Sequence, residues 1–463
     1  MGSVGLSEPL REGGFEGTTS GAPLLPASWP TWWLSLQQAA NAPANLTFGL
    51  VCSVILPAVV ADIVPAATKG SALGTAAMMG AVAQLLQPVF GAMSDRMRTK
   101  ALVCGRRRWF IIVAQLLTVC ALAVMAVASA AGSAPDDLGS ASGSVASSEH
   151  PATSSYRFRF WVLACGYTGF QLANCMFCGP MGAIIPELVP QHQQIASGGW
   201  SVFWSALSGI AAALLGIAFG EGYYTANETY VILGVLNLAG LVLGVIAFSG
   251  KPGCCELEAA PPPLPPPKKL HVQRADSAAS ALGDSCWRQI VPFLLPFKHT
   301  PFIAMFAFLF MQTIAAVVGV YFTQYYLHDT VACSRRSFQL IGFGNKPVVN
   351  SALSATSLLS LSQSVASFCM ALLGAPLSQV LPGGKRVLIA ITSFGMGAGY
   401  GAFGFTDDFS VVMACSTLVG ACAGLGSPPV FAMLADSLPN TGQDGGKDFN
   451  LLVSATALCQ IIV

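Results

Sequence analysis

The stretch "FWVLACGYTGFQLANCMFCGPMGAIIPELVP", residues 160–190, has a second copy in "FSVVMACSTLVGACAGLGSPPVFAMLADSLP", residues 409–439. Each copy opens on an aromatic residue, and an Ala-Cys pair follows a few residues later. Each then spaces a proline, an acidic residue and a second proline at the same intervals, namely Pro180, Glu187 and Pro190, and Pro429, Asp436 and Pro439. This self-similarity indicates an internal repeat, so we expect a chain built from two related halves.

The composition indicates a protein that is solvated by lipid. Charged residues make up 9% of the chain, against about 25% in a typical soluble domain, and apolar residues make up 54%. A soluble globule would have too few charges here to cover its apolar surface. The net charge of +1 also gives no overall field that would point to a charged partner.

Eleven apolar segments are long enough to cross a hydrocarbon core of about 30 Å as helices. They lack the alternation of barrel strands, and only helices or closed barrels span lipid. We therefore predict an all-α membrane protein. The predicted spans are 41–63, 70–92, 109–131, 159–185, 199–220, 229–249, 301–327, 355–380, 387–405, 409–435 and 449–463.

Composition also divides the chain into four parts. Residues 1–30 are predicted to be a disordered cytoplasmic tail, and 31–249 an N-terminal bundle of six helices. Residues 250–299, with "PPPLPPP" at 261–267, are predicted to be a Pro-rich cytoplasmic linker. Residues 300–463 are expected to form an incomplete C-terminal bundle of about five helices, with two interpretations left open, a truncated gene model or an incomplete second bundle.

The basic residues predict the orientation of the chain. Most of the 22 Lys and Arg fall on the cytoplasmic side if the N-terminus is cytoplasmic. We therefore expect a multi-pass protein with its N-terminus in the cytoplasm, in the plasma membrane or in a vacuolar or other endomembrane. A monomer is expected.

A cluster of charge lies in "GAMSDRMRTKALVCGRRR", residues 91–108. Gly-x-x-x-Asp-Arg followed by Gly-Arg-Arg resembles the loop signature between the second and third helices of major facilitator transporters. A weaker echo, "LGAPLSQ" at 373–379, ends the eighth span and precedes Lys385 and Arg386. The cluster lies between two membrane spans, so binding of a nucleic acid is not expected.

Within that superfamily, the Ser before Asp95 and the triple arginine resemble the branch of glycoside–pentoside–hexuronide:cation symporters that contains the sucrose transporters. The resemblance covers most of 40–463 and implies the major facilitator fold, two six-helix bundles that work by alternating access. Two departures concern the substrate. Eight residues separate Arg96 from Gly105, and Gly182 stands where the sucrose transporters carry an arginine.

The resemblance also implies a gate at the cytoplasmic ends of the helices. Asp95 would lie near the start of the eleventh helix, where the helix dipole favours a carboxylate. Arg96 and one of the arginines after Gly105 would pair with Glu187, and Asp436 would meet Lys385 or Arg386. The alternatives are a basic anchor on the cytoplasmic face and, for Asp436, a helix cap. The predicted gate residues are Gly91, Asp95, Arg96, Arg106, Arg107, Glu187, Arg386 and Asp436.

Uncharged amides in the middle of the predicted spans are candidates for substrate binding. Polar groups in lipid are costly and usually face the interior of a bundle. An amide both donates and accepts hydrogen bonds, which suits the hydroxyl groups of a sugar. The alternative for each amide is a hydrogen bond that joins two helices. Gln84, Asn174 and Gln312 are the first candidates, followed by Asn45, Gln171 and Gln363.

Proton coupling requires a protonatable group within the membrane. Asp62, near the outer end of the first span, is the nearest candidate, and a solvated residue at the end of the span is the alternative. No cofactor and no metal is expected, although Cys175 and Cys178 have Cys-x-x-Cys spacing within an apolar helix. An enzyme is not expected either, because no nucleophile–base pair stands out.

The sequence therefore predicts a secondary active transporter of small solutes, and within that class a proton-coupled symporter of a sugar or another glycoside. Its partners would be the solute, protons and the lipid bilayer. A facilitator, a symporter of a non-sugar metabolite, and a non-transporting sensor or scaffold on the same fold are the alternatives.

Overall fold

The computed structural model describes most of the chain between Trp29 and Ile462. The described residues are 29–96, 106–130, 152–190, 193–249, 293, 295–327, 342–343, 346–347, 351–382, 384–438 and 445–462. At some helix ends only the backbone is described, including 95–96, 106–108 and 183–188. The predicted tail 1–30 and linker 250–299 lie mostly outside the described residues.

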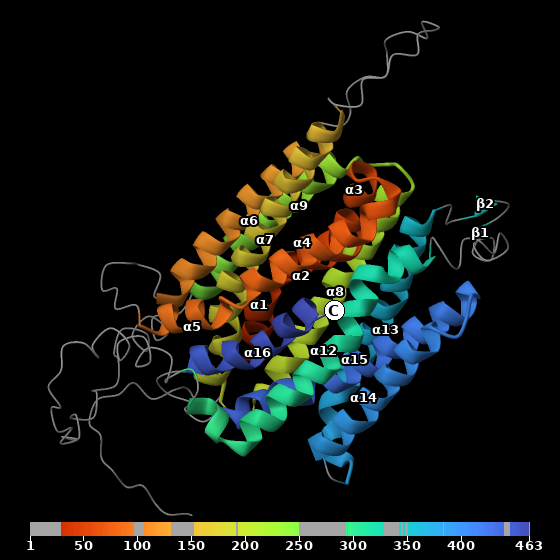
Figure 1. The fold of residues 1–463 in the computed structure, drawn as a ribbon. Helices are drawn as coiled ribbons and strands as arrows, with labels where there is room; N and C mark the ends of the chain where they lie inside the picture. The colour runs from red at the N-terminus through yellow and green to blue at the C-terminus, as the bar shows by residue number, and fades with distance from the viewer. Residues whose placement is uncertain are drawn as a thin grey trace, which may run out of the picture.

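The described residues of the first half are mostly helical (Figure 1). They are α1 (Thr31–Ala39), α2 (Ala42–Leu50), the π-helix η1 (Val51–Ile55), α3 (Leu56–Ile63), the 3-10 turn η2 (Ala66–Thr68), α4 (Lys69–Gln84), α5 (Gln87–Arg96), α6 (Arg106–Ala130), α7 (Ala152–Leu188), α8 (Gln194–Gly220) and α9 (Ala226–Ser249).

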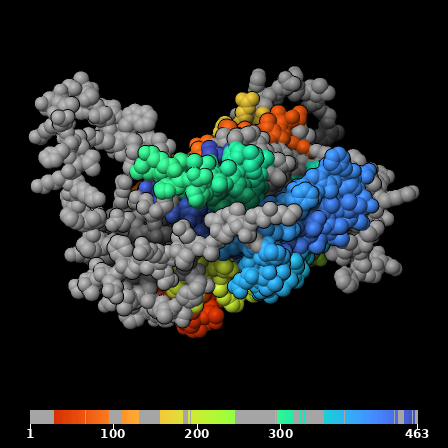
Figure 2. All heavy atoms as spheres, turned by 90° about the horizontal axis from the view of Figure 1, so that it is seen from below, coloured from red at the N-terminus to blue at the C-terminus, as the bar shows by residue number. Residues whose placement is uncertain are grey.

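The second half is also helical. Its elements are the 3-10 turn η4 (Leu295–Lys298), α12 (Thr300–Tyr326), α13 (Ala352–Val380), α14 (Gly384–Phe403), α15 (Phe409–Ser437) and α16 (Gly445–Ile462), with two strands of two residues each, β1 (Gly342–Phe343) and β2 (Lys346–Pro347). The strands pair antiparallel, Gly342 with Pro347. Seen from below, α12 and the blue helices of this half cover much of one face (Figure 2).

Each predicted span contains a helix, and seven described segments are both long and apolar enough to cross a membrane. These seven are Thr31–Ile63, Lys69–Ser94, Trp109–Ala130, Gln194–Gly220, Ala226–Gly244, Ala352–Val380 and Phe409–Leu434. The prediction of an all-α membrane fold is confirmed. The chain is an integral, multi-pass membrane protein.

The first two spans are broken where proline removes a backbone donor. Pro57 cannot donate to the carbonyl of Ser53, and the preceding turn, η1, is a π-helix. Pro88 likewise cannot donate to Gln84, where α4 ends before α5 begins. The first helix also begins earlier than the predicted span 41–63, at Thr31, and pauses at Ala40 and Asn41.

The folded part of the chain extends beyond two of the predicted boundaries. Trp29, assigned above to the tail, is buried and stacks on Trp33 with 4.3 Å between ring centroids. The backbone of Trp29 also donates to and accepts from the side-chain amide of Gln193. Phe297, assigned to the linker, packs edge-on against Phe302 at 5.3 Å. Aromatic packing therefore orders the last residues of both segments.

The two halves meet where α8 packs along α13. Here Gly216 faces Ser357 so closely that a Cβ atom at Gly216 would overlap the serine hydroxyl. Near the ends of the two helices, Ser354 donates a hydrogen bond of 2.5 Å to Glu221. Small residues let two helices approach closely in a membrane, which explains this contact. We call it the serine seam, and it is formed by Gly209, Gly216 and Gly220 of α8 with Ser354, Ser357 and Ser364 of α13.

Candidate functional site: a cavity between the two bundles

A cavity of about 760 Å³ lies between the halves. The first half contributes residues from α1, α2, η1, α5, α7 and α8, and the second half from α12 to α16. None of the described lining residues is Asp, Glu, Lys, Arg or His. The polar ones are Gln38, Asn41, Asn45, Ser53, Gln87, Ser201, Ser205, Gln312, Thr323, Thr356, Ser360, Gln363, Ser364, Ser367, Tyr400, Ser416 and Ser427.

Three of the predicted substrate-binding amides line this cavity. Asn45 comes from α2, in the first half, and Gln312 and Gln363 come from α12 and α13, in the second. Gln312 approaches the sulfur of Met396 at 3.6 Å, and Gln363 hydrogen-bonds Tyr400, which also lines the cavity. Amides from both bundles thus face the same space.

The other three predicted amides are not among the lining residues. Gln84 of α4 donates to Gln171 of α7 at 2.7 Å, and Gln171 donates to the hydroxyl of Tyr167 at 2.6 Å. Gln84 and Gln171 are 7% and 0% exposed. Asn174 accepts a contact of 3.5 Å from the thiol of Cys178. Gln84 and Gln171 thus join α4 to α7, which was the alternative for these two amides, whereas Asn174 contacts a residue of its own helix.

The amide criterion missed the serines of the cavity. Ser360, Ser364 and Ser367 line it from α13, and Ser201 and Ser205 line it from α8. A signal was present in the sequence, because serine recurs every three or four residues from Ser354 to Ser367, with Ser362 as an extra serine, and this spacing puts the recurring serines on one helix face. Such a stripe gives a hydroxyl-lined wall without any charge.

Five predicted gate residues have side chains outside the described part. The backbone puts Asp95 and Arg96 at the end of α5, Arg106 and Arg107 at the start of α6, and Glu187 near the end of α7. Their pairing stays a prediction. Gly91 is described and buried in α5. The same helix is held to α16 by a hydrogen bond of 3.1 Å from Gln87 to Asn450.

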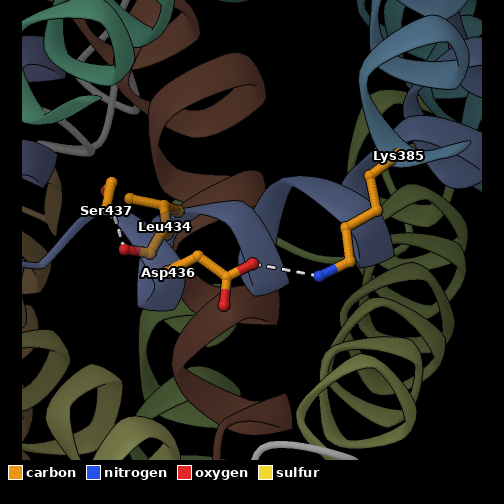
Figure 3. A network of polar contacts seen from close by, with 4 residues as sticks. All are labelled: Lys385, Leu434, Asp436 and Ser437. Atoms are coloured by element: carbon orange, nitrogen blue, oxygen red, sulfur yellow. Dashed lines mark hydrogen bonds and ion pairs between the residues drawn. The ribbon is translucent and has the colours of Figure 1, made fainter. Parts of the chain in front are cut away.

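The remaining gate residues lie in the second half, where Lys385 pairs with Asp436 at 3.0 Å (Figure 3). Arg386, the other candidate partner, is exposed. The pair joins α14 to α15, two helices of one bundle, and Ser437 donates back to the carbonyl of Leu434 beside it. Because 33% and 40% of the two charged side chains stay exposed, the pair contributes at most about 1 kcal/mol.

Asp62, the proton-coupling candidate, lies at the end of α3 with its side chain exposed. It is within electrostatic range of Arg159 on α7 and is not among the cavity-lining residues. Among the described residues no group of three His, Cys, Asp or Glu side chains is arranged to hold a metal. Cys178 lines the cavity, as does Cys52.

No family model matches the sequence, and no curated protein matches it either. Solved structures do match in fold. A bacterial homologue of the iron transporter ferroportin, in an outward-facing state, aligns with a TM-score of 0.58 at 14% identity and covers 93% of this chain and 90% of its own.

The proton:xylose symporter XylE, a major facilitator superfamily protein, aligns with a TM-score of 0.57 at 15% identity over 93% of this chain and 87% of its own. This chain has the major facilitator fold. Both similar structures are transporters, and identities this low establish the fold alone. The cavity of the present chain lies where this fold joins its two halves, which is the usual position of a transport site.

Proposed function

We propose that this major facilitator chain is a secondary transporter that moves a small, uncharged, hydroxyl-rich solute, a sugar, by alternating access. The observation that carries the proposal is the cavity wall, which offers amides and hydroxyls from both halves and no charged side chain among its described residues. Such groups can donate to and accept from sugar hydroxyls. The cavity volume of about 760 Å³ is within the range of roughly 300–1,000 Å³ of small-molecule sites.

Aromatic side chains give the same cavity an apolar component. Phe48 lines it from the first half, and Tyr400 and Phe403 line it from the second. Their faces can pack on the C–H surface of a sugar ring while the amides and serines take the hydroxyls. A metal cation fits this lining less well, because hard cations prefer carboxylates and the described lining has none.

Coupling to protons is the finer part of the proposal, with Asp62 as its candidate residue. A facilitator is the second candidate function, and a specific observation favours it. Asp62 is exposed at a helix end, and the described lining holds no carboxylate or imidazole that could carry a proton beside the solute. Dissipating the proton gradient with a protonophore distinguishes the two, since only symport loses accumulation above the external concentration.

The test of the function is uptake by cells that lack their own sugar carriers. Radiolabelled sucrose, maltose, glucose and xylose are offered to cells that express the chain, and we expect at least one to enter faster than in cells with an empty vector. A fluorescent tag reports which membrane contains the protein and on which side its N-terminus lies. If none of the four sugars enters while an amino acid or a nucleoside does, the sugar assignment is wrong and the transporter assignment stands.

A further inference from the structure

At one end of the cavity, two phenylalanines of the second half rest on two glycines of the first. Phe449 of α16 covers Gly182 of α7 so closely that a Cβ atom at Gly182 would overlap its ring. A Cβ atom at Gly198 of α8 would lie 3.1 Å from the Cβ atom of Phe431 on α15. Gly182, Phe431 and Phe449 all line the cavity.

The two contacts are related by the internal repeat. Gly182 and Phe431 hold the same position in the two copies of the repeated stretch, residues 160–190 and 409–439. The first contact joins α7 to α16, and the second joins their counterparts in the other half, α15 and α8. In both contacts the phenylalanine belongs to the second half and the glycine to the first. The arrangement therefore repeats across the boundary between the bundles.

The surroundings of Phe449 are closed. Lys447 and Asp448, which precede it at the start of α16, are 4% and 0% exposed although both are ionisable. They lie 3.5 Å apart, and Asn450 on the other side of Phe449 accepts a hydrogen bond from Gln87. Burial of charged side chains next to the ring is the condition expected of a sealed helix end, because an open one would leave them in water.

We propose that Phe449, whose ring is seated on Gly182, and Phe431, whose Cβ atom packs against Gly198, are the gate that separates the cavity from the end of the molecule where α7 and α15 end. We call these four residues the aromatic gate. A ring excludes water, and a glycine lets the ring seat on the backbone and leave again without passing a side chain. The inference rests on the proposed transport function, since a gate matters only if the cavity opens to both sides.

Cys178 offers a direct probe of this gate. It lines the cavity and lies four residues before Gly182 on α7, which is about 6 Å further from the helix end. A reagent that arrives from the gate side must pass Phe449 to reach its thiol. The measurement needs no substrate, so its outcome is independent of whether a sugar is the solute.

The experiment uses the full chain with Cys178 as its sole cysteine, in sealed membrane vesicles of either orientation. An impermeant cationic methanethiosulfonate reagent is added outside, and labelling is followed by the mass of the protein. A second variant, with Cys178→Ser and Pro382→Cys, identifies the vesicles whose gate side faces outward. Pro382 is suitable because it is exposed between α13 and α14, near Lys385 and Asp436.

We expect slow labelling of Cys178 from the gate side, and a rate at least tenfold higher in Phe449→Ala and in Phe431→Ala. Phe394→Ala is the matched control, since this ring is 81% exposed on α14 and its loss should leave the rate unchanged. If Phe449→Ala or Phe431→Ala fails to fold, Gly182→Ala tests the same gate, because the added methyl group displaces the ring of Phe449. It should also raise the labelling rate. The proposal is overturned if Cys178 is labelled from this side as fast as the thiol of the Pro382→Cys variant, or if a double alanine variant is labelled at the original rate.

Discussion

The serine seam and the aromatic gate both join the two bundles, but they do so with opposite kinds of side chain. Along the seam, small residues on α8 and α13 bring the helix backbones together, and hydroxyl groups fill what space is left. At the gate, the ring of Phe449 lies against Gly182, and the Cβ atom of the second phenylalanine, Phe431, lies against Gly198.

This difference indicates which contact holds the halves and which one opens. A seam of small residues loses little side-chain entropy and keeps its contacts through a small rotation, so it suits a pivot. A ring on a glycine is either seated or withdrawn, so it suits a gate. Four substitutions can break or sharpen this comparison, and they follow in order of expected effect.

The largest effect is expected from Gly216→Leu in the serine seam. The new side chain would overlap Ser357 and would lie against Leu50, so α8 could not keep its approach to α13. Overpacking of this kind costs roughly 1–3 kcal/mol or more, and we expect a lower melting temperature in detergent together with loss of uptake. Gly199→Leu on the same helix is the control, because nothing lies within 4 Å of a Cβ atom there. Equal melting temperatures of the two variants would show that the protein stays stable when α8 and α13 are forced apart.

At the aromatic gate we expect Gly182→Ala to lower the stability less than Gly216→Leu does. The size of this loss should depend on the residue at position 449. The methyl group displaces the ring of Phe449, and Phe449→Leu, with its smaller side chain, should recover part of the loss. The measurement is a double-mutant cycle on melting temperature with an expected coupling of about 0.5–3 kcal/mol. Additive effects of the two substitutions would mean that the contact carries no energy.

The amides provide the third test, which separates the cavity from the packing of the first bundle. Gln363→Leu removes a cavity-lining amide, so we expect uptake at low solute concentration to fall about tenfold with little change in melting temperature, as for the loss of a hydrogen bond of about 1–1.5 kcal/mol. Gln84→Leu leaves Gln171 without its donor in a buried site, so it should lower the melting temperature first. A reversed pattern would move the binding site into the first bundle.

The smallest effect is expected from Asp436→Asn, which removes the exposed pair with Lys385. The change in unfolding free energy should stay within about 0.2–1 kcal/mol, and uptake should stay near that of the unchanged chain, because the pair lies within one bundle. A matched charge swap, Lys385→Asp with Asp436→Lys, should also leave uptake and stability close to those of the unchanged chain. Uptake that falls severalfold at unchanged stability would restore the gate role that the repeat implied for Asp436.

The sequence was most informative about helices and least about which polar groups share a space. Length and hydropathy are local properties, so the helix in each predicted span could be read directly, and Pro57 and Pro88 were visible although the breaks at them were not predicted. Gln84 and Gln363 look alike in sequence, since both are mid-span amides. One is paired within a bundle and the other lines the cavity, and this depends on helix rotation, which no local signal records.

By itself, the sequence determined an all-helical membrane protein with two related halves, because the need to satisfy backbone groups in lipid leaves an apolar segment of this length few alternatives. The repeat also placed Gly182 and Phe431 at equivalent positions. Only the tertiary structure decided that each of them meets a partner on the opposite half, and that serines rather than amides dominate the cavity wall. The physical reason is that contacts between bundles join residues far apart in the chain, and their pairing is fixed by how whole helices pack.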